Sequence, residues 1–344
     1  MSRSYHIMVR EALLSALGSD AFATETAAAR FLADLRLRPP QGPHVADLAT
    51  NAAILLTSAG REGADARIDA LLSRLKARPD LTEVRYEANG YINLIYKPEF
   101  WQAQLPLLLR DGAGYGLDGL AAGLGAVTVR RPASLHDLYG LREDVNGQAL
   151  RRLAEKAGTV IIEVAAENTE SDSGYPAGAA IARCGEARTK FALIANPPAF
   201  MRAFSPILAT ERSYNNPVFA IPYARMMLAR LNATRAAGER AILEGADLSF
   251  LNGGEERALM RRLADWPLAV EETFRKQDGF YLASFLQDLS LLFFRLFETE
   301  RPISSGYLGG GAETPARRVL LGALDAILDG GMTSLGVDMV KEYG

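Results

Sequence analysis

The sequence has few of the residues that build covalently linked or metal-bound sites. Only one of its 344 residues is a cysteine, Cys184, which excludes a disulfide within the chain. The three histidines, His6, His44 and His136, lie far apart, and no two have the spacing of a helical zinc motif. We therefore predict no metal site.

A strong net charge is also absent. Lysine and arginine number 38 against 41 acidic residues, a formal net charge of −3. A uniformly positive surface that attracts any nucleic acid is therefore excluded, and an RNA partner would need local basic surfaces. With 49% hydrophobic and 23% charged residues, the composition is that of a folded chain.

Export and membrane signals are weak. The first residues resemble the start of a helix more than a cleavable export signal, so we predict a cytoplasmic protein. One apolar segment, residues 280–297, approaches the length of a membrane span, but Gln287, Asp288 and Arg295 interrupt it. We predict a central core helix there and no membrane partner.

Residues 1–119 have a mixed pattern. Apolar periodicity predicts helices over residues 45–59 and 68–75, and a further helix over 100–110. Between them, residues 83–86 and 90–96 predict two strands that pair around Asn89-Gly90. This order predicts helices packed on a small sheet.

Residues 120–200 predict a single βαβ unit. Gly114, Gly116 and Gly119 have the spacing of a dinucleotide-binding loop, but a helix precedes them and a strand follows, so we interpret them as a linker. A strand over 127–131, a helix over 141–157 and a strand over 160–165 then form the unit. One such unit is small for a nucleotide-binding sheet, which requires several parallel strands.

Residues 201–344 read as all-helical. Helices are predicted over residues 217–237, 255–265, 267–276, 280–300 and 315–329. Gly330-Gly331 predicts the end of the last helix, and the apolar segment 280–297 is expected at the centre of a bundle. The fold class predicted for the whole chain is α+β.

Several segments resemble the arginyl-tRNA synthetases. Residues 47–51 and 90–96 resemble the family's N-terminal additional domain, which touches the D-loop corner of tRNA. Asn216-Pro217-Val218-Phe219 with Tyr223-Ala224 is similar to the opening of the DALR-type anticodon-binding domain, and residues 316–337 resemble its last helix and tail. The resemblance implies these two domains at 1–119 and 201–344, and a catalytic remnant at 120–200.

The middle of the chain departs from the family. Leu141-Arg142 and Gly147-Gln148-Ala149-Leu150 are similar to the second half of the nucleotide signature, but residues 137–140 replace its histidines. No counterpart of the lysine-rich signature loop lies between Thr159 and Asn216. Since activation of an amino acid needs an ATP cradle and phosphate clamps together, we expect the reaction to be lost, and with it the need for ATP.

The resemblance implies RNA contacts in both end domains. In the first domain the candidates are Asn93 and Tyr96, with core packing as the alternative for Tyr96. The crowding of basic residues in this domain adds Arg74 and Lys76 as candidate phosphate contacts. In the last domain they are Phe219 and Tyr223, four residues apart on one helix face, and Arg225. Four cations of the middle segment could face RNA or the position of the missing catalytic part: Arg142, Arg151, Arg152 and Lys156.

The hypothesis from the sequence is a non-catalytic, arginyl-tRNA synthetase-like protein that binds tRNA, with tRNA-Arg as one candidate. Its two contact regions would be the elbow and the anticodon arm. One alternative is an arginine-tRNA ligase-type enzyme that retains ATP-dependent activation with help from a partner enzyme. Another is a scaffold for protein interactions.

Overall fold

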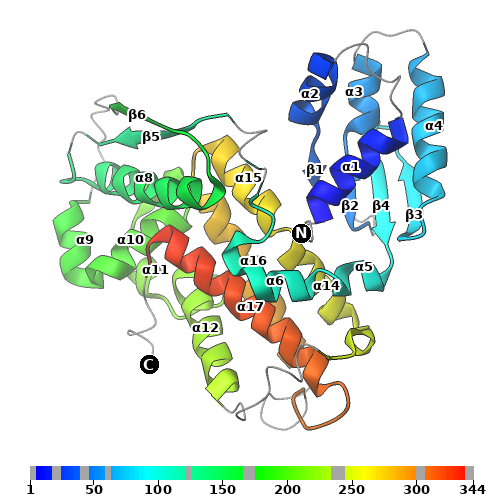
Figure 1. Cartoon of the computed structure of the whole chain (residues 1–344). Coiled ribbons are helices and arrows are strands. Elements are labelled where there is room, and N and C mark those ends of the chain that lie inside the picture. Colours follow the sequence, from blue (N-terminus) through cyan, green and yellow to red (C-terminus); the bar gives the residue numbers. More distant parts are fainter. Residues whose placement is uncertain are drawn as a thin grey trace. The chain divides into compact units, whose positions relative to one another are not determined.

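The computed structural model describes residues 5–17, 25–38, 46–58, 63–118, 120, 125–132, 134–165, 175–233, 245–299 and 307–337. The chain divides into two compact units, Met1–Gln104 and Leu105–Gly344, coloured blue to cyan and cyan to red in Figure 1. The mixed α+β architecture confirms the predicted fold class. Division into three domains at 119 and 200 stays a prediction.

Unit 1 is built on a four-stranded antiparallel sheet in the order β1-β2-β4-β3. The predicted hairpin is confirmed, with Gly90 at a φ of +83° in its turn. The strands are β1 (Leu37–Arg38), β2 (Leu48–Thr50), β3 (Leu81–Tyr86) and β4 (Ile92–Tyr96). The helices are α1 (Tyr5–Leu17), α2 (Glu25–Asp34), α3 (Ala52–Ser58), α4 (Ala64–Lys76) and α5 (Pro98–Gln102).

The single helix predicted over residues 45–59 is wrong in its first half. Residues 48–50 form β2, and the helix begins only at Ala52. Leu48 pairs with Leu94 of β4, and the Asp47 carboxylate accepts the Tyr96 backbone N–H at 2.7 Å. Pairing with a distant strand therefore overrides the local helical periodicity.

The helix predicted over residues 100–110 is two helices, α5 and α6 (Leu105–Asp111). Pro106 is the reason, because a proline has no N–H to continue a helix but fits its first turn. The unit boundary falls at this break.

In unit 2, β5 (Val127–Arg131), α8 (Leu138–Ala157) and β6 (Ile161–Ala165) form the predicted βαβ unit with parallel strands. We call it the residual βαβ unit. Gly147 lets α8 approach β5 closely, since a β-carbon there would lie 3.0 Å from Val129 Cγ1.

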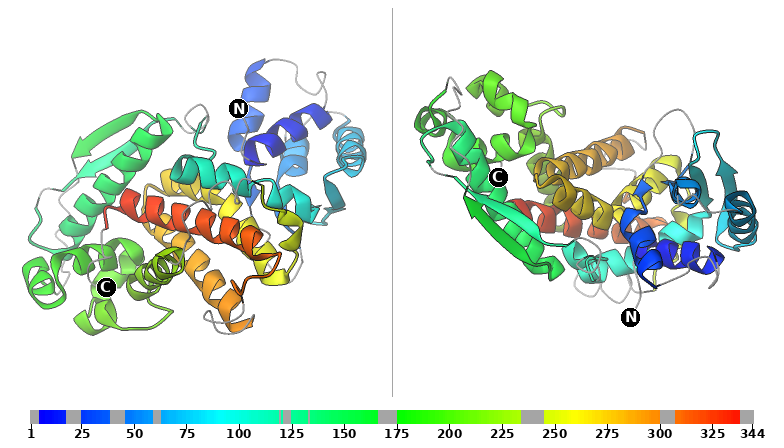
Figure 2. Two further views of the ribbon diagram at one scale, coloured as in Figure 1. Left: turned by 60° about the horizontal axis from the view of Figure 1, so that its bottom comes forward. Right: turned by 90° about the horizontal axis from the view of Figure 1, so that it is seen from above.

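Helices make up the rest of the described part of unit 2. They are α9 (Ala177–Cys184), α10 (Glu186–Ala195), α11 (Pro206–Thr210), α12 (Pro217–Ala233), α14 (Gly254–Ala264), α15 (Trp266–Lys276), α16 (Phe280–Thr299) and α17 (Thr314–Leu335). Helix α16 packs against α10, α12, α14, α15 and α17, which confirms the predicted central helix (Figure 2). Phe280–Phe297 is apolar enough to span a membrane, and 56% of it is buried within the protein.

The predicted end of the last helix at Gly330-Gly331 is wrong. Helix α17 continues to Leu335 and ends at Gly336, which has a φ of +74°. A β-carbon at Gly331 would collide with Leu286 of α16, and one at Gly330 with Ala113. These two glycines therefore let α17 pack closely against α16 and against Ala113, and they do not terminate the helix.

Candidate nucleic-acid interface

Four aromatic rings meet where α12 begins. Phe219 and Tyr223 stack with ring centroids 5.0 Å apart and planes 16° apart, so they share a helix face as predicted. Tyr214, from the preceding segment, stacks on Phe294 of α16 at 4.3 Å and lies 6.2 Å from the Tyr223 ring. We call Tyr214, Phe219, Tyr223 and Phe294 the aromatic group.

Hydrogen bonds fix the segment that carries the aromatic group at the start of α12. The Asn216 side chain accepts the Val218 N–H at 3.1 Å and donates to the Glu211 carbonyl at 2.8 Å, which fixes the start of α12. Gln287 of α16 donates to the Asn215 carbonyl at 2.9 Å. Tyr214 is 43% exposed, so a planar ligand can reach the stack from its side.

Arg225 is placed differently from the rings. Its guanidinium forms an ion pair with Asp329 of α17, and its side chain is 17% exposed. The predicted RNA contact would therefore require this pair to open, and in this structure Arg225 fastens α12 to α17.

Asn93 lies in the middle of the sheet of unit 1. It pairs with Ala49 of β2 on one side and Arg85 of β3 on the other. Its side chain points away from the apolar face of the sheet, is 6% exposed and donates to Glu87 Oε1 at 2.9 Å. An RNA group at this position would have to compete with the Glu87 carboxylate for the amide.

Tyr96 belongs to the core, as its alternative predicted. Its ring stacks on Phe100 at 4.0 Å and meets Trp101 edge-on at 5.6 Å. The side chain is 4% exposed, and burial raises the pKa of its hydroxyl above the ordinary value. No open ring face remains for a base.

Arg74 and Lys76 are exposed near the C-terminal end of α4, where a phosphate could reach them. Arg74 Nη1 also donates to the Ala16 carbonyl of α1 at 2.8 Å. Since α4 packs on β3 through its buried leucines, the two cations lie across the sheet from Asn93. The structure does not bring the four candidates of unit 1 onto one face.

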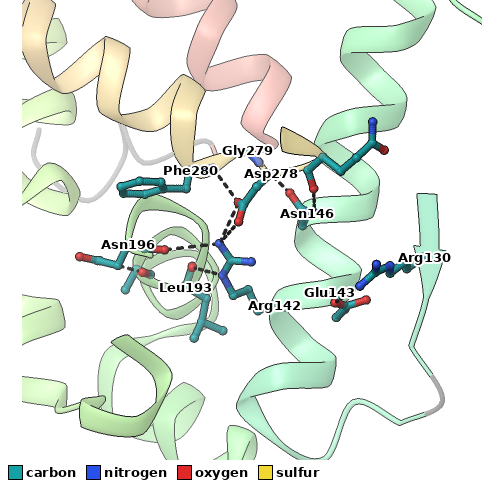
Figure 3. A network of polar contacts seen from close by, with 11 residues as sticks. Arg130, Arg142, Glu143, Asn146, Leu193, Asn196, Asp278, Gly279 and Phe280 are labelled. Carbon is teal, nitrogen blue, oxygen red and sulfur yellow. Dashed lines mark hydrogen bonds and ion pairs between the residues drawn. The ribbon is translucent and has the colours of Figure 1, made fainter. Parts of the chain in front are cut away.

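The helix that resembles the nucleotide signature is used for internal bonding. Asp137 caps α8, because its carboxylate accepts the Gly140 N–H at 2.8 Å. Arg142 pairs with Asp278 at 2.8 Å and donates to the Leu193 carbonyl at 3.0 Å (Figure 3). The guanidinium side chain is 9% exposed, so it is fully engaged by the bundle.

The segment between α15 and α16 completes this network. Asn146 of α8 donates to the Gln277 carbonyl at 2.9 Å and accepts the Gly279 N–H at 2.7 Å. Gln277 Oε1 accepts the Thr128 N–H at 2.8 Å, on the side of β5 away from β6. Gln277 thereby occupies the strand edge where a larger parallel sheet would continue.

The other cations of α8 are also engaged. Arg151 pairs with Glu163 of β6 at 2.7 Å. Arg152 donates to the Ser334 carbonyl at 3.2 Å, and Lys156 donates to the Ser334 hydroxyl at 3.0 Å, so both bind the last turn of α17. Cations at a helix C-terminus are favourable, and they explain how α8 holds α17.

A pocket of about 480 Å³ lies beside the network. Arg130, Glu143 and Lys276 line it together with the Arg142–Asp278 pair. One oxygen of Glu143, Oε2, is buried in the structure without a hydrogen-bond partner. Among the described residues, no three His, Cys, Asp or Glu side chains are grouped so that they could hold a metal ion.

Three residues of these clusters were not predicted: Tyr214, Phe294 and Asp278. Tyr214 lies two residues before Asn216-Pro217-Val218-Phe219, and its aromatic side chain beside that segment could have indicated it. Phe294 and Asp278 lie within or beside α16, and no local pattern connects them with α12 or α8.

Comparison with known sequences identifies relatives for part of the chain. Residues 225–342 match the family of DALR anticodon binding domains. The arginine–tRNA ligase of Parvibaculum lavamentivorans is 35% identical over 131 residues, which are 37% of this chain and 22% of that protein. The ligase of Cereibacter sphaeroides is 31% identical over 154 residues, which are 44% of this chain and 26% of that protein. The matched stretches thus cover only 22% and 26% of these relatives' lengths.

Two solved structures resemble a larger share of the chain than these sequence relatives do. The arginyl-tRNA synthetase of Plasmodium falciparum has a TM-score of 0.60 at 9% identity, over 98% of each chain. That of Thermus thermophilus has a TM-score of 0.55 at 13% identity, over 98% of this chain and 99% of that one. At such identities the likeness concerns the fold alone.

Proposed function

We propose that this homologue of the arginyl-tRNA synthetases, which has a DALR anticodon-binding domain, binds tRNA and does not aminoacylate it on its own. The observation that carries the proposal is the aromatic group. Three of its rings, Tyr214, Phe219 and Tyr223, lie just before the matched residues, and Phe294 lies within them. The stacked rings include an exposed tyrosine, Tyr214. Stacking on such a platform contributes about 1 to 3 kcal/mol for each unpaired base.

The absence of catalysis by the chain alone is supported by the residual βαβ unit. The family's histidines are replaced, and Asp137 serves as a helix cap in their place. Arg142 and Asn146, on the helix that resembles the nucleotide signature, bond to the bundle. In the described part of the chain, the parallel sheet has two strands, and Gln277 closes one edge of it.

The test is a binding titration of the purified chain with transcripts of tRNA-Arg and of an unrelated tRNA. We expect micromolar or tighter binding that falls steeply as the salt concentration rises, because phosphate contacts release counterions. A short hairpin with the anticodon arm of tRNA-Arg should compete. Equal affinity for tRNA and for a random RNA of the same length would contradict the proposal.

A second candidate function, ATP-dependent activation of a small acid, is favoured by the pocket of about 480 Å³ beside α8. Its volume is within the range of small-molecule sites. Pyrophosphate exchange with ATP and arginine separates the two candidates. Pyrophosphate exchange catalysed by the purified chain alone would establish the second candidate. An exchange rate no higher than that without the protein supports the first.

A further inference from the structure

One face of the residual βαβ unit carries exposed apolar side chains. In the parallel register, Thr128 pairs with Ile162 and Arg130 with Val164, so these four side chains point to one face. Helix α8 packs on the other face (Figure 1). Val127 and Val129, which point to that face, are buried. We call the face with Val160, Ile162, Val164, Thr128 and Arg130 the bare face.

The bare face is apolar along β6. Val160, Ile162 and Val164 are 68%, 50% and 38% exposed and follow one another at every second residue. Parallel strands are normally covered on both faces by helices. Three adjacent β-branched side chains in water also create a risk of aggregation unless something covers them.

Two cations lie at the free edge of β5, beside the bare face. Arg130 is 68% exposed, and its ion pair with Glu143 has the long separation of 4.0 Å. Lys276 lines the pocket at this edge together with Thr128, Arg130 and side chains of α8. Its side chain is 52% exposed and lies 4.0 Å from Glu272. Such exposed, loosely paired cations remain available to carboxylates of another molecule.

We infer that the bare face is a docking surface for an acidic amphipathic helix of a partner protein. The helix would place its apolar stripe on Val160, Ile162 and Val164 and its carboxylates beside Arg130 and Lys276. A pair of strands is about as wide as one helix, so one helix covers it. A second copy of this chain fits less well, because its own Arg130 and Lys276 would add like charge to the interface.

This inference goes beyond tRNA binding and has a separate readout. The probe is a labelled helical peptide of about 18 residues with a leucine stripe flanked by glutamates, and its twin has lysines in place of the glutamates. Fluorescence anisotropy with the full chain should show roughly tenfold tighter binding of the acidic peptide. Sedimentation of the chain alone should show no dimer that depends on the bare face.

The variant Ile162→Glu should weaken binding of the acidic peptide roughly tenfold. Arg130→Glu should reverse the preference between the two peptides, and this second variant leaves the apolar residues intact. The matched control is Ile207→Glu, at an apolar residue of α11 that is 73% exposed. It should bind the acidic peptide like the unmodified chain.

Three results would overturn the inference: equal binding of both peptides, equal loss in Ile162→Glu and Ile207→Glu, or a dimer that Ile162→Glu dissociates. Binding of tRNA should be the same in Ile162→Glu and in the unmodified chain. Failure of the docking proposal and failure of the tRNA proposal are therefore observed in different titrations.

Discussion

Tyr96 in unit 1 and Tyr223 in unit 2 were predicted to touch RNA from the same kind of resemblance, but they have different surroundings. Phe100 and Trp101 enclose the first ring, which is 4% exposed. The second ring is half-buried and stacks with Phe219 next to the exposed Tyr214. A motif can therefore place an aromatic residue on an element, whereas distant segments decide whether its ring is available.

The largest expected effect tests the buried member of this pair. Tyr96→Ala should lower the free energy of unfolding by about 3 to 5 kcal/mol, because it leaves a cavity between Phe100 and Trp101. Tyr96→Phe keeps the packing and should change stability by about 1 kcal/mol or less. Urea unfolding of the full chain measures both. A stable Tyr96→Phe variant that loses tRNA affinity would restore Tyr96 as an RNA contact.

The next effect concerns the cations of unit 2, which were predicted to be available and are instead engaged. Arg142→Met should destabilise the chain by about 3 kcal/mol, because it leaves the Asp278 carboxylate without its guanidinium in a largely buried position. The control is Arg30→Met, whose side chain is 87% exposed. Equal stability of the two variants would show that the network around Arg142 contributes little.

A smaller effect is expected from pH, because the stability of unit 1 should depend on the protonation of His6. His6 of α1 is buried, and its pKa is lowered to about 3 by burial and then by Arg10. The unfolded chain therefore binds a proton near pH 6.5 that the folded chain does not bind, and stability is lost as the pH falls. Between pH 6.5 and pH 5 the loss should be about 2 kcal/mol.

His6→Gln removes the titrating group and should flatten this dependence in urea unfolding at the two pH values. Unit 2 provides the reference, because signals from its Trp266 should change less with pH than signals from Trp101 of unit 1. An unchanged pH dependence in His6→Gln would assign the effect to other groups.

The sequence was sufficient for features that depend on local pattern. The hairpin around Gly90, the βαβ unit and the central helix α16 are all as predicted. It failed where a partner lies far along the chain. Residues 48–50 join a sheet through Leu94, and Gly331 accommodates Leu286, so neither β2 nor the true end of α17 could be inferred locally.

In the candidate site, too, local features were predictable and contacts with distant segments were not. The common face of Phe219 and Tyr223 follows from helical spacing alone. The engagement of Arg225 by Asp329, and of Arg142 by Asp278, depends on helix packing that no single segment specifies. Residue type therefore predicted the kind of contact better than the identity of the partner.

The smallest expected effect tests Tyr223, the half-buried member of the opening comparison. Tyr223→Leu keeps an apolar side chain on α12 but removes one ring of the stack, so stability should change little. Affinity for tRNA should fall by about 1 to 2 kcal/mol, or roughly tenfold, if a base stacks on the aromatic group. The matched control is Tyr175→Leu, because Tyr175 is also half-buried and pairs with an aromatic ring, Phe204, at 5.6 Å. Equal loss of affinity in both variants would mean that tyrosine removal acts through general destabilisation, whereas loss in Tyr223→Leu alone would locate the RNA at the start of α12.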